Sequence, residues 1–340
     1  MRFVITGGGT GGHLVVAKAL AEQIKLDGDE AIFIGSTSGQ DRAWFEHSEL
    51  FKHRYFLESR GVVNKKGLTK LKSLMQILKS SLKTRHILKE YKADATISVG
   101  GYSAAPACFA TLIMRLPLFI HEQNAVCGRL NRLLKPYTRA FYSSYDPTSP
   151  VREYPLRAGV LSGVKARTDF KTILFLGGSQ GASAINKFAL RSAAMLHQRG
   201  IKIIHQCGDN EFKKIDLRYK KLGIDVELFG FSSDLISIIN RVDMAVSRSG
   251  ASTLWELVGL AVPTLFVPYP HAASNHQYYN ALKLQQQGLA ELCTEESLST
   301  KVLEQFLDQD LARISADLLK LDTHNGTPQI LASIKESICS

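Results

Sequence analysis

The stretch Arg2-Phe3-Val4-Ile5-Thr6-Gly7-Gly8-Gly9-Thr10-Gly11-Gly12-His13 decides the fold and supplies the first candidate site. A short apolar run that breaks into glycines predicts a buried strand entering a loop, and apolar residues at helical spacing follow over Leu14–Leu26. Glycines at such a turn let backbone N–H groups converge on an anion at the helix N-terminus, where the helix dipole also favours negative charge. The opening therefore predicts a phosphate site with a titratable side chain, His13, at its edge.

The spacing Gly7-x-Gly9-x-x-Gly12 also fits the fingerprint of dinucleotide-binding folds. That fingerprint needs an acidic residue at the end of the second strand, where it binds a ribose. Here the second predicted strand runs into Gly35-Ser36, and the next acidic residue is Asp41. The sequence therefore argues against a NAD or FAD site at this turn.

Apolar runs alternate with segments of helical periodicity, and a proline-rich stretch, 147–155, divides them into two sets. Such alternation predicts parallel sheets covered by helices, and 340 residues suit two domains better than one. We expect an α/β fold of two doubly wound, Rossmann-like parallel-sheet domains that face a cleft, over 1–157 and 158–324. A last helix at about 325–340 is expected to pack back on the first domain. The predicted strands are Arg2–Thr6, Ala31–Ile34, Ala95–Val99, Pro117–His121, Ala140–Ser143, Thr172–Leu176, Lys202–Gln206, Val226–Phe229, Met244–Ser247 and Thr264–Val267.

The formal net charge of +11 implies a polyanionic partner: nucleic acid, an acidic membrane surface or phosphorylated substrates. Basic residues concentrate in Lys65–Lys92, where Leu71, Leu74, Met75 and Leu78 recur at helical spacing among the lysines. This segment is either a surface helix with a solvated basic face or a helix that docks on an anionic membrane surface. It lacks interleaved aromatic residues and no recognition module is visible, so we expect no nucleic-acid partner.

Glycine- or serine-rich loops follow several predicted strands, and their repetition favours phosphate binding over a set of tight turns. None contains Gly-Lys followed by Ser or Thr, which argues against an ATPase. In the last loop, Thr253-x-x-Glu256 fits a capping box, which needs no ligand, but a carboxylate one turn into a helix also suits a ribose diol. The loops are Gly7–His13, Gly100–Ser103, Gly177–Ala182 and Ser247–Thr253.

Two polar clusters also follow strands. His121-Glu122-Gln123-Asn124 predicts either a site or a network that anchors a loop. The amides and imidazoles of 268–280 suit sugar hydroxyls, because they both donate and accept hydrogen bonds. His271 and His276 have no third ligand nearby, and Asp27-Gly28-Asp29 is expected in a solvated turn at the opposite end of the sheet, so we expect no metal site.

Together these motifs resemble, in order and approximate spacing from Met1 to about Ala290, those of the MurG family of peptidoglycan N-acetylglucosaminyltransferases. The resemblance implies a GT-B glycosyltransferase that moves N-acetylglucosamine (GlcNAc) from UDP-GlcNAc to the 4-hydroxyl of undecaprenyl-diphospho-N-acetylmuramoyl-pentapeptide. That reaction converts lipid I into lipid II with inversion at the anomeric carbon. The resemblance also implies no obligatory metal or other cofactor, and a peripheral location at the cytoplasmic face of the plasma membrane. The motifs are Gly8-Gly-Thr-Gly-Gly-His13, Gly100-Gly-Tyr-Ser103, His121-Glu-Gln-Asn124, Gly177-Gly-Ser-Gln-Gly-Ala182, Arg248-Ser-Gly-Ala251, Glu256 and His276-Gln277-x-x-Asn280-Ala281.

By this resemblance the first domain binds the lipid-linked acceptor and the second binds the nucleotide-sugar. His13 is the candidate general base, and Glu122 and Asn124 complete the candidate catalytic set as positioning residues. In the donor site, Phe231 is expected beside uracil and Glu256 on the ribose. Acceptor contacts are expected from Gly9, Thr10, Gly11, His13, Tyr102, Ser103 and Asn124. Donor contacts are expected from Thr10, Gly11, Gly12, Asn124, Arg157, Ser179, Phe231, Arg248, Ser249, Ala251, Ser252, Thr253, Glu256, His276 and Gln277, the last two on GlcNAc.

The chain departs from the family pattern at two places. Val16 stands where the family has a proline after the loop histidine, and Tyr154-Pro-Leu-Arg157 stands for Asn-Pro-Val-Arg. Because Arg152 lies just upstream, it competes with Arg157 for the donor-site role. The alternative functions are another GT-B UDP-sugar transferase, a UDP-GlcNAc epimerase and, from a different class, a nucleic-acid-binding protein.

Overall fold

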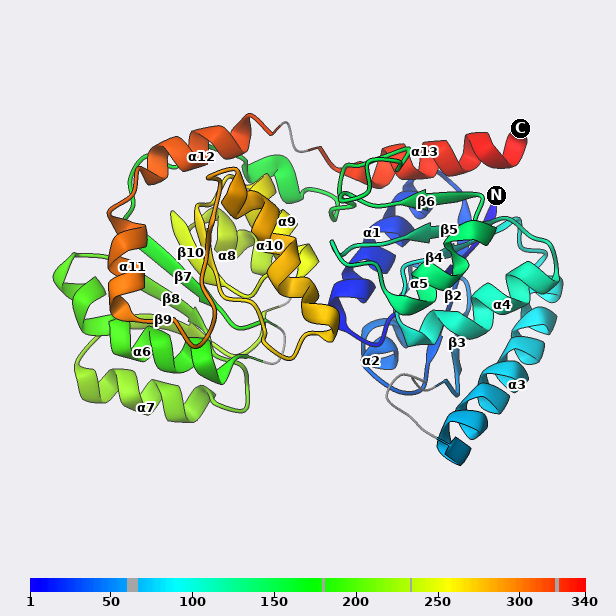
Figure 1. Cartoon of the computed structure of the whole chain (residues 1–340), viewed down its shortest axis with the longest axis horizontal. Coiled ribbons are helices and arrows are strands. Elements are labelled where there is room, and N and C mark those ends of the chain that lie inside the picture. The colour runs from blue at the N-terminus through cyan, green and yellow to red at the C-terminus, as the bar shows by residue number, and fades with distance from the viewer. Residues whose placement is uncertain (60–66, 179–180, 233, 322–323) are drawn as a thin grey trace. The chain divides into compact units, whose positions relative to one another are not determined.

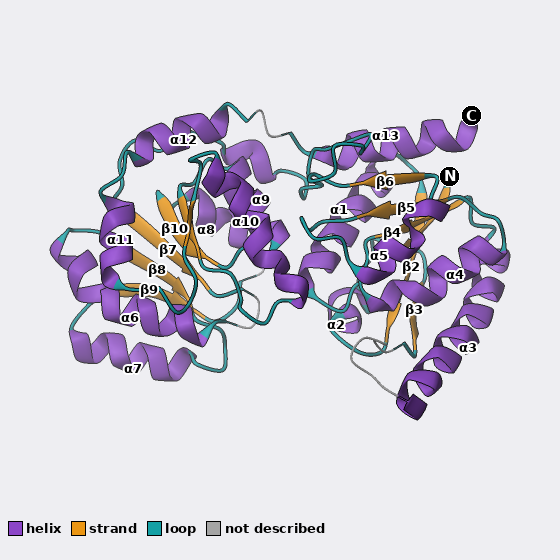
Figure 2. Ribbon diagram, in the orientation of Figure 1, coloured by secondary structure: helices purple, strands orange, loops and turns teal. Residues whose placement is uncertain are grey.

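The computed structural model describes residues 1–340 except 60–66, 179–180, 233 and 322–323, and these described residues form two compact units (Figure 1). Unit 1 comprises Met1–Ala158 and Asn325–Ser340, and unit 2 comprises Gly159–His324. Each unit contains a six-stranded parallel sheet with helices on its faces (Figure 2). The two sheets have the same strand order, β3-β2-β1-β4-β5-β6 in unit 1 and, read from its other edge, β9-β8-β7-β10-β11-β12 in unit 2. The predicted fold class of two doubly wound α/β domains is confirmed.

In unit 1 the carboxyl ends of the central strands lie level with one another. Thr6 at the end of the first strand pairs with Ile34 and Ser98 on its two neighbours. The loops that follow these strands therefore emerge at one edge of the sheet, where open α/β sheets bind ligands. The strands are β1 (Arg2–Thr6), β2 (Glu30–Ser36), β3 (Arg54–Leu57), β4 (Ala95–Ser98), β5 (Leu118–His121) and β6 (Ala140–Tyr142); the helices are α1 (Gly11–Leu26), α2 (Asp41–Phe45), α3 (Gly67–Tyr91), η1 (Tyr102–Ala104), α4 (Ala105–Ile113), α5 (Arg129–Leu134), η2 (Lys135–Tyr137) and α13 (Gly326–Cys339).

Unit 2 repeats this arrangement. Leu176 at the end of its first strand pairs with Gln206 and Ser247 on either side, so the following loops again share one edge. The strands are β7 (Thr172–Leu176), β8 (Lys202–Gln206), β9 (Val226–Phe229), β10 (Met244–Ser247), β11 (Thr264–Phe266) and β12 (Glu291–Leu292); the helices are η3 (Val160–Gly163), α6 (Ser183–Gln198), α7 (Phe212–Leu222), α8 (Leu235–Asn240), α9 (Ala251–Gly259), η4 (Ala273–Asn275), α10 (His276–Gln286), α11 (Thr300–Leu307) and α12 (Leu311–Leu319).

The structure contains two edge strands, β3 and β12, that the sequence analysis did not predict. Arg54–Leu57 buries only its last residue, and Glu291–Leu292 is two half-buried residues long. Edge strands face fewer neighbours, so their sequences carry a weaker apolar signal. Helix α1 also begins at Gly11 rather than at Leu14.

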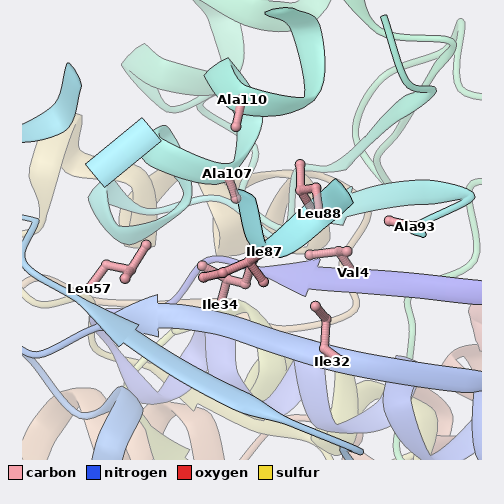
Figure 3. Close-up of a cluster of buried hydrophobic side chains, with 9 residues drawn as sticks. All are labelled: Val4, Ile32, Ile34, Leu57, Ile87, Leu88, Ala93, Ala107 and Ala110. Carbon is pink, nitrogen blue, oxygen red and sulfur yellow. The ribbon is translucent and has the colours of Figure 1, made fainter. Parts of the chain in front are cut away.

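The core of unit 1 forms where α3 and α4 cover the sheet. Figure 3 shows Ile87 of α3 close to Val4 and Ile34 on the strands, within a cluster of fully or nearly fully buried side chains. Burial of each valine, leucine or isoleucine side chain in this cluster contributes about 1.5–3 kcal/mol, which fixes α3 at its C-terminal end. The cluster consists of Val4, Ile32, Ile34, Leu57, Ile87, Leu88, Ala93, Ala107 and Ala110.

In the part of α3 before Ile87, small polar side chains are buried and large apolar side chains are exposed. Its buried face carries small hydroxylated side chains, among them Ser73 and Thr84, which donate hydrogen bonds to carbonyls one turn back in the same helix. Its large apolar side chains are exposed: Leu71, Leu74, Met75, Leu78 and Leu82. The helix predicted from the spacing of these residues is confirmed, and their side chains form an apolar stripe that faces solvent rather than the core.

The last helix, α13, packs against α1 in unit 1 (Figure 1). Its Lys335 Nζ lies 2.6 Å from a carboxylate oxygen of both Asp27 and Asp29. Asp27 and Gly28 are exposed, so the solvated turn expected from the sequence is confirmed, and the two carboxylates of this turn also pair with the returning helix.

Candidate functional site

The glycine loop of unit 1 is held in place by contacts to its own backbone. Gly7, Gly8 and Gly9 all have positive φ, which glycine alone adopts without strain. The Gly8 N–H donates to the Gly100 carbonyl at 3.0 Å, and a side chain at Gly101 would overlap the Gly8 carbonyl. The glycine loops after β1 and β4 are thus packed directly on each other at the carboxyl edge of the sheet.

A buried carboxylate, Asp41, supports this loop from within unit 1. Asp41 Oδ1 accepts the Gly9 N–H at 2.5 Å, and Oδ2 accepts the Ser36 N–H at 2.8 Å. Burial raises the pKa of Asp41, and these hydrogen bonds to the charged form oppose the rise. Because the Gly9 N–H is directed at Asp41, it is not directed at a ligand in this conformation.

Tyr102 closes the other side of the loop. Its hydroxyl donates to the Ser38 carbonyl at 2.9 Å, and a side chain at Gly9 would come within 2.8 Å of its ring. Burial raises the pKa of Tyr102, and the nearby Asp41 charge adds to that rise. Ser103 is buried at the same edge. The structure therefore brings together the expected acceptor residues of both loops.

His13 lies in the first turn of α1, directly after Thr10, Gly11 and Gly12. Thr10 Oγ1 is 2.8 Å from His13 Nδ1. If Nδ1 carries the proton and donates it to Thr10, the second nitrogen, Nε2, becomes the one that can accept a proton. His13 Nε2 lies beside Gly100, because a side chain at this glycine would stand 3.4 Å from it, in ordinary van der Waals contact.

Glu122, which follows β5, organises the loop that carries Asn124. Its Oε1 accepts hydrogen bonds from the Asn124 N–H and side-chain amide, and its Oε2 accepts from Gly128 N–H at 2.9 Å and Asn131 Nδ2 at 2.8 Å. A carboxylate with both oxygens engaged in this way is a positioning group rather than a proton acceptor. Of the two interpretations left open for 121–124, loop anchoring describes Glu122, and Asn124 is the residue that it anchors.

His121, the last residue of β5, is buried with neither ring nitrogen hydrogen-bonded to any residue that the structure describes. Burial lowers its pKa to about 3, and the neighbouring His13 contributes in the same direction. His121 therefore stays neutral across the physiological range. Its ring packs edge-on against Tyr154 at 5.8 Å between centroids.

In unit 2 the loop after β7 is held by an amide. Gln206 Nε2, at the end of β8, donates to the Gly178 carbonyl at 2.9 Å, and the Gly181 N–H donates to the same carbonyl at 2.9 Å. A side chain at Gly181, where φ is +73°, would overlap the Cys207 carbonyl. Ser179, expected at the donor diphosphate, lies outside the described residues.

The start of α9 decides between the two interpretations of Thr253 and Glu256. The N-cap residue is Gly250, which has no capping side chain, and Thr253 is the third residue of the helix. The capping-box interpretation is therefore wrong. Glu256 is buried in the second turn of α9 rather than at its end. Ala251, Ser252 and Thr253 form the first turn, whose positive dipole end suits a diphosphate.

Ser249 and Gln277 are joined by a short network. Ser249 Oγ donates to the Gln277 carbonyl at 2.8 Å, and Gln277 Oε1 accepts the Tyr269 N–H at 2.9 Å. Asn280 Nδ2 donates to the Ser249 carbonyl at 3.1 Å. His276 begins α10 directly before Gln277. The structure thus brings the polar residues expected at the sugar next to the loop expected at the diphosphate.

Arg248 is paired within unit 2. Its guanidinium forms an ion pair with Glu295 and donates to the Val267 and Pro268 carbonyls at 3.0 and 3.1 Å. It also lies over the Tyr269 ring, 5.5 Å from the centroid. Much of the Arg248 charge is therefore compensated in this conformation, and its clearest task is to fix the turn that follows β11.

The remaining expected donor residues are more dispersed. Phe231 has 56% of its surface exposed, as a residue that stacks on a base would before binding. Arg157 is half-buried and lies in unit 1, close to the boundary at Ala158, whereas its rival Arg152 is exposed. Among the residues that the structure describes, no group of three or more His, Cys, Asp or Glu side chains could hold a metal ion.

Four residues that hold these loops, Asp41, Asn131, Gln206 and Glu295, were not assigned from the sequence. Each acts on a glycine loop or on a site residue from a different segment of chain. The available signals were an acidic residue in the loop region after a strand for Asp41 and an amide at the end of a strand for Gln206. Nothing in the local pattern indicates their partners.

Comparison with known proteins defines the class. The N-terminal domain of glycosyltransferase family 28 matches residues 3–143, and its C-terminal domain matches residues 172–331. The glycosyltransferase SsfS6 from Streptomyces sp. SF2575, 13% identical, covers 99% of this chain and of its own with a TM-score of 0.69, and so shares the fold. The chain is a glycosyltransferase with the GT-B fold.

Two curated relatives define the family more narrowly. Both are named UDP-N-acetylglucosamine–N-acetylmuramyl-(pentapeptide) pyrophosphoryl-undecaprenol N-acetylglucosamine transferase. The Wolinella succinogenes protein is 50% identical over 94% of this chain and 95% of its own, and the Helicobacter pylori J99 protein is 45% identical over 98% and 99%. The crystal structure of Acinetobacter baumannii MurG, 26% identical, covers 98% of this chain and 99% of its own with a TM-score of 0.80. The chain belongs to the MurG family.

Proposed function

We propose that this enzyme transfers GlcNAc from UDP-GlcNAc to the 4-hydroxyl of the N-acetylmuramoyl residue of lipid I, giving lipid II with inversion at the anomeric carbon. The observation that carries the proposal is identity of 45–50% over nearly the full length of relatives whose names state this donor and this acceptor. That full-length identity disfavours an epimerase, a different sugar transferase and a nucleic-acid-binding protein.

On the acceptor side, His13 Nε2 takes the proton of the attacking hydroxyl. The Thr10 hydroxyl accepts the Nδ1–H and so holds the imidazole in the tautomer that can do this. Asn124, fixed by Glu122, orients the acceptor sugar, and the dipole end of α1 faces the acceptor diphosphate. The neutral state of His121 removes a second positive charge that would oppose protonation of His13.

On the donor side, the first turn of α9 with Ser249 holds the diphosphate of the leaving group. Glu256 binds the ribose hydroxyls, Gln277 with His276 binds GlcNAc, and Phe231 covers uracil. Backbone dipoles oriented before the reaction stabilise the charge that develops on UDP. We therefore propose that no metal or other cofactor is obligatory, so transfer should persist after dialysis against EDTA.

Incubation with UDP-GlcNAc and a short-chain lipid I analogue tests the reaction. The expected product carries one β-linked GlcNAc, identified by mass spectrometry and by the anomeric proton coupling in NMR. An α-linked product, or hydrolysis of UDP-GlcNAc without transfer, would contradict the proposal. UDP-N-acetylmannosamine as the product would identify an epimerase instead.

We also propose that α3 docks the enzyme on the anionic cytoplasmic face of the plasma membrane as a peripheral protein. The exposed stripe of α3 includes Met75, which is 64% exposed, and the exposed Lys72, Lys79 and Lys83 flank it. Each lysine near an anionic surface contributes about 1 kcal/mol, and apolar side chains in the interface add to it. Lys65 and Lys66 lie outside the described residues. No helix among the described parts of the chain is long and apolar enough to cross a bilayer.

Vesicle co-sedimentation tests this surface. Lys72→Glu with Lys79→Glu should weaken binding to vesicles of phosphatidylglycerol and phosphatidylethanolamine. Salt should weaken wild-type binding, because dissolved ions screen exposed charges that lie more than about 8–10 Å apart. The matched control, Lys213→Glu with Lys221→Glu, changes the net charge equally on exposed positions of α7. Equal loss in both pairs would show a general charge effect and would contradict docking through α3.

A further inference from the structure

The carboxylate of Asp41 is completely buried at the ligand-binding edge of the unit 1 sheet, and the reaction described above does not use it. A buried carboxylate is costly unless its oxygens accept hydrogen bonds. Asp41 meets this cost with the Gly9 N–H at 2.5 Å and the Ser36 N–H at 2.8 Å. It thereby ties the glycine loop after β1 to the end of β2.

The surrounding backbone is shaped to admit this carboxylate. A side chain at Gly8 would overlap Asp41 Oδ1, and one at Gly35 would come within 2.9 Å of Oδ2. Gly39, two residues before Asp41, leaves room for the Tyr102 hydroxyl, which a side chain there would approach to 2.8 Å. Glycines in the loop after β1 and at the end of β2 thus make space for Asp41 and for Tyr102, which closes the β1 loop from the other side.

The two bonds of Asp41 fix the direction of the loop immediately before α1. The Gly9 peptide is held with its N–H inward, and the next residue, Thr10, is the N-cap of α1 and contacts His13. A change in the Gly9 peptide would therefore displace both the first turn of α1 and the partner of the His13 imidazole. A displacement of about 1 Å in a reacting group can cost about a hundredfold in rate.

We propose that Asp41 is a positioning residue for the acceptor site, which it serves by holding the Gly9 peptide and, through it, Thr10 and the start of α1. The proposal rests on the function proposed above. Asp41 touches no substrate in this role. The Gly9 N–H and the Ser36 N–H face different oxygens, so the role needs two acceptor atoms, which a carboxylate supplies and an amide does not.

The substitution Asp41→Asn separates this role from simple packing. Asparagine has nearly the same shape, but its NH₂ group must face either the Gly9 N–H or the Ser36 N–H, so one of the two bonds is lost. The matched control is Asp94→Asn, because Asp94 Oδ2 accepts the Arg2 N–H at 2.7 Å at the opposite end of the same sheet. Both changes remove one negative charge from unit 1.

We expect Asp41→Asn to lower kcat/KM for a short-chain lipid I analogue by about 10- to 100-fold, with the dissociation constant for UDP unchanged. The Asp94→Asn variant should retain wild-type values for both. In spectra of glycine-labelled enzyme, the Gly9 amide proton should lie downfield in wild type, because it donates to a carboxylate, and should move upfield in Asp41→Asn alone. Wild-type acceptor kinetics in Asp41→Asn, or equal losses for donor and acceptor, would overturn the proposal.

A binding measurement keeps the test independent of transfer. Inorganic pyrophosphate should shift the Gly11 and Gly12 amides of wild type, and Asp41→Asn should weaken that response while the Gly250 response in unit 2 stays unchanged. If transfer fails in wild type while this difference persists, the proposed reaction fails and the role of Asp41 stands. If Asp41→Asn does not fold, slow hydrogen exchange at the wild-type Gly9 amide supports the proposal, and exchange as fast as in exposed loops overturns it.

Discussion

The glycine loops after β1 and β7 occupy the same position in two sheets of identical strand order, yet they are held by opposite chemistry. In unit 1 a carboxylate after the second strand, Asp41, accepts a loop N–H. In unit 2 an amide at the end of the second strand, Gln206, donates to a loop carbonyl. One loop therefore stands on a buried charge and the other on a neutral group.

The buried histidines show the same contrast between the units. His205 on β8 is enclosed with Nδ1 3.0 Å from the Tyr219 hydroxyl and Nε2 3.0 Å from Asn186 Oδ1. His121 on β5 is equally buried, but neither nitrogen has a hydrogen-bond partner among the described residues. A fully satisfied network is typical of a structural role, whereas unsatisfied buried polar groups concentrate at functional sites. The comparison indicates a structural role for His205, whereas His121 keeps, near His13, hydrogen-bonding atoms that no described residue uses.

The largest effect is expected at the catalytic edge of unit 1. His13→Ala should lower kcat by about 10²–10⁴-fold, because a general base contributes that much, and should leave the affinity for UDP unchanged. Steady-state kinetics and calorimetric titration with UDP check both parts. The control His47→Ala removes an exposed histidine from the same unit and should have wild-type kinetics. A loss of UDP affinity in His13→Ala would move this loop to the donor site and break the contrast between the units.

The second prediction compares the two buried histidines directly. His205→Leu should lower the free energy of unfolding by at least about 2 kcal/mol, because it leaves Tyr219 and Asn186 without their buried partner. His121→Leu should stay within about 1 kcal/mol of wild type, because no described hydrogen bond is lost. Denaturant unfolding of each variant at pH 7 measures the difference. Equal losses would show that the two environments are energetically alike.

The same histidines set a pH dependence. Burial lowers both pKa values to about 3, and the usual value of 6.5 applies in the unfolded chain. Between these values the unfolded chain binds protons that the native protein does not, so stability falls as pH is lowered from 6.5, by up to about 1.4 kcal/mol per pH unit for each histidine. Asp41 acts in the opposite sense, because its pKa is raised in the native protein. Each His→Leu variant should show a shallower pH dependence in denaturant unfolding at pH 4.5–6.5.

A third test concerns the donor contact of unit 2. Glu256→Gln should weaken UDP binding about tenfold, because a ribose hydroxyl loses a charged acceptor, without a matching loss of stability. Glu227→Gln, which changes an exposed carboxylate paired with Arg241, serves as the control. If Glu256→Gln unfolds unit 2 more easily and binds UDP as wild type does, Glu256 is a structural residue only.

The smallest effect is expected from Gln206, the uncharged residue that holds the loop after β7. Gln206→Leu removes the donor to the Gly178 carbonyl and should weaken UDP binding about fivefold, corresponding to about 1 kcal/mol. Gln198→Leu makes the same substitution at an exposed position of α6. A greater loss of acceptor than donor affinity in Gln206→Leu would contradict the assignment of this loop to the donor.

The central strands were predictable from sequence because they are buried on both faces, as in Thr172–Leu176, where four of five residues are buried. The edge strand Arg54–Leu57 was not, because only Leu57 is fully covered. Helical spacing predicted α3, but spacing alone does not say which face meets the core. In α3 the small hydroxylated side chains are buried against the core and the leucine side chains are exposed to solvent.

The site residues also divide into those that a local motif reveals and those whose contacts are distant in the sequence. His13 and Asn124 stand in local motifs, so their sequence neighbours reveal them. Asp41 acts on Gly9, 32 residues away, and Glu295 acts on Arg248, 47 residues away, so no local pattern reports either contact. The capping-box interpretation of Thr253 was wrong because the N-cap of α9 is Gly250, which places Thr253 in the first turn of the helix.

The return of α13 to unit 1 makes unit 2 an insertion within unit 1, and this arrangement imposes an order on biosynthesis. Lys335 is separated by 308 residues from Asp27, so the ribosome has made all of unit 2 before the partner of that carboxylate exists. Unit 2 can begin folding while the chain is still being translated. Unit 1 waits with the α13-binding face of α1 uncovered until the last helix emerges. A nascent chain that still lacks α13 therefore exposes this face of α1 to solvent, at a place far from the loops that carry the chemistry.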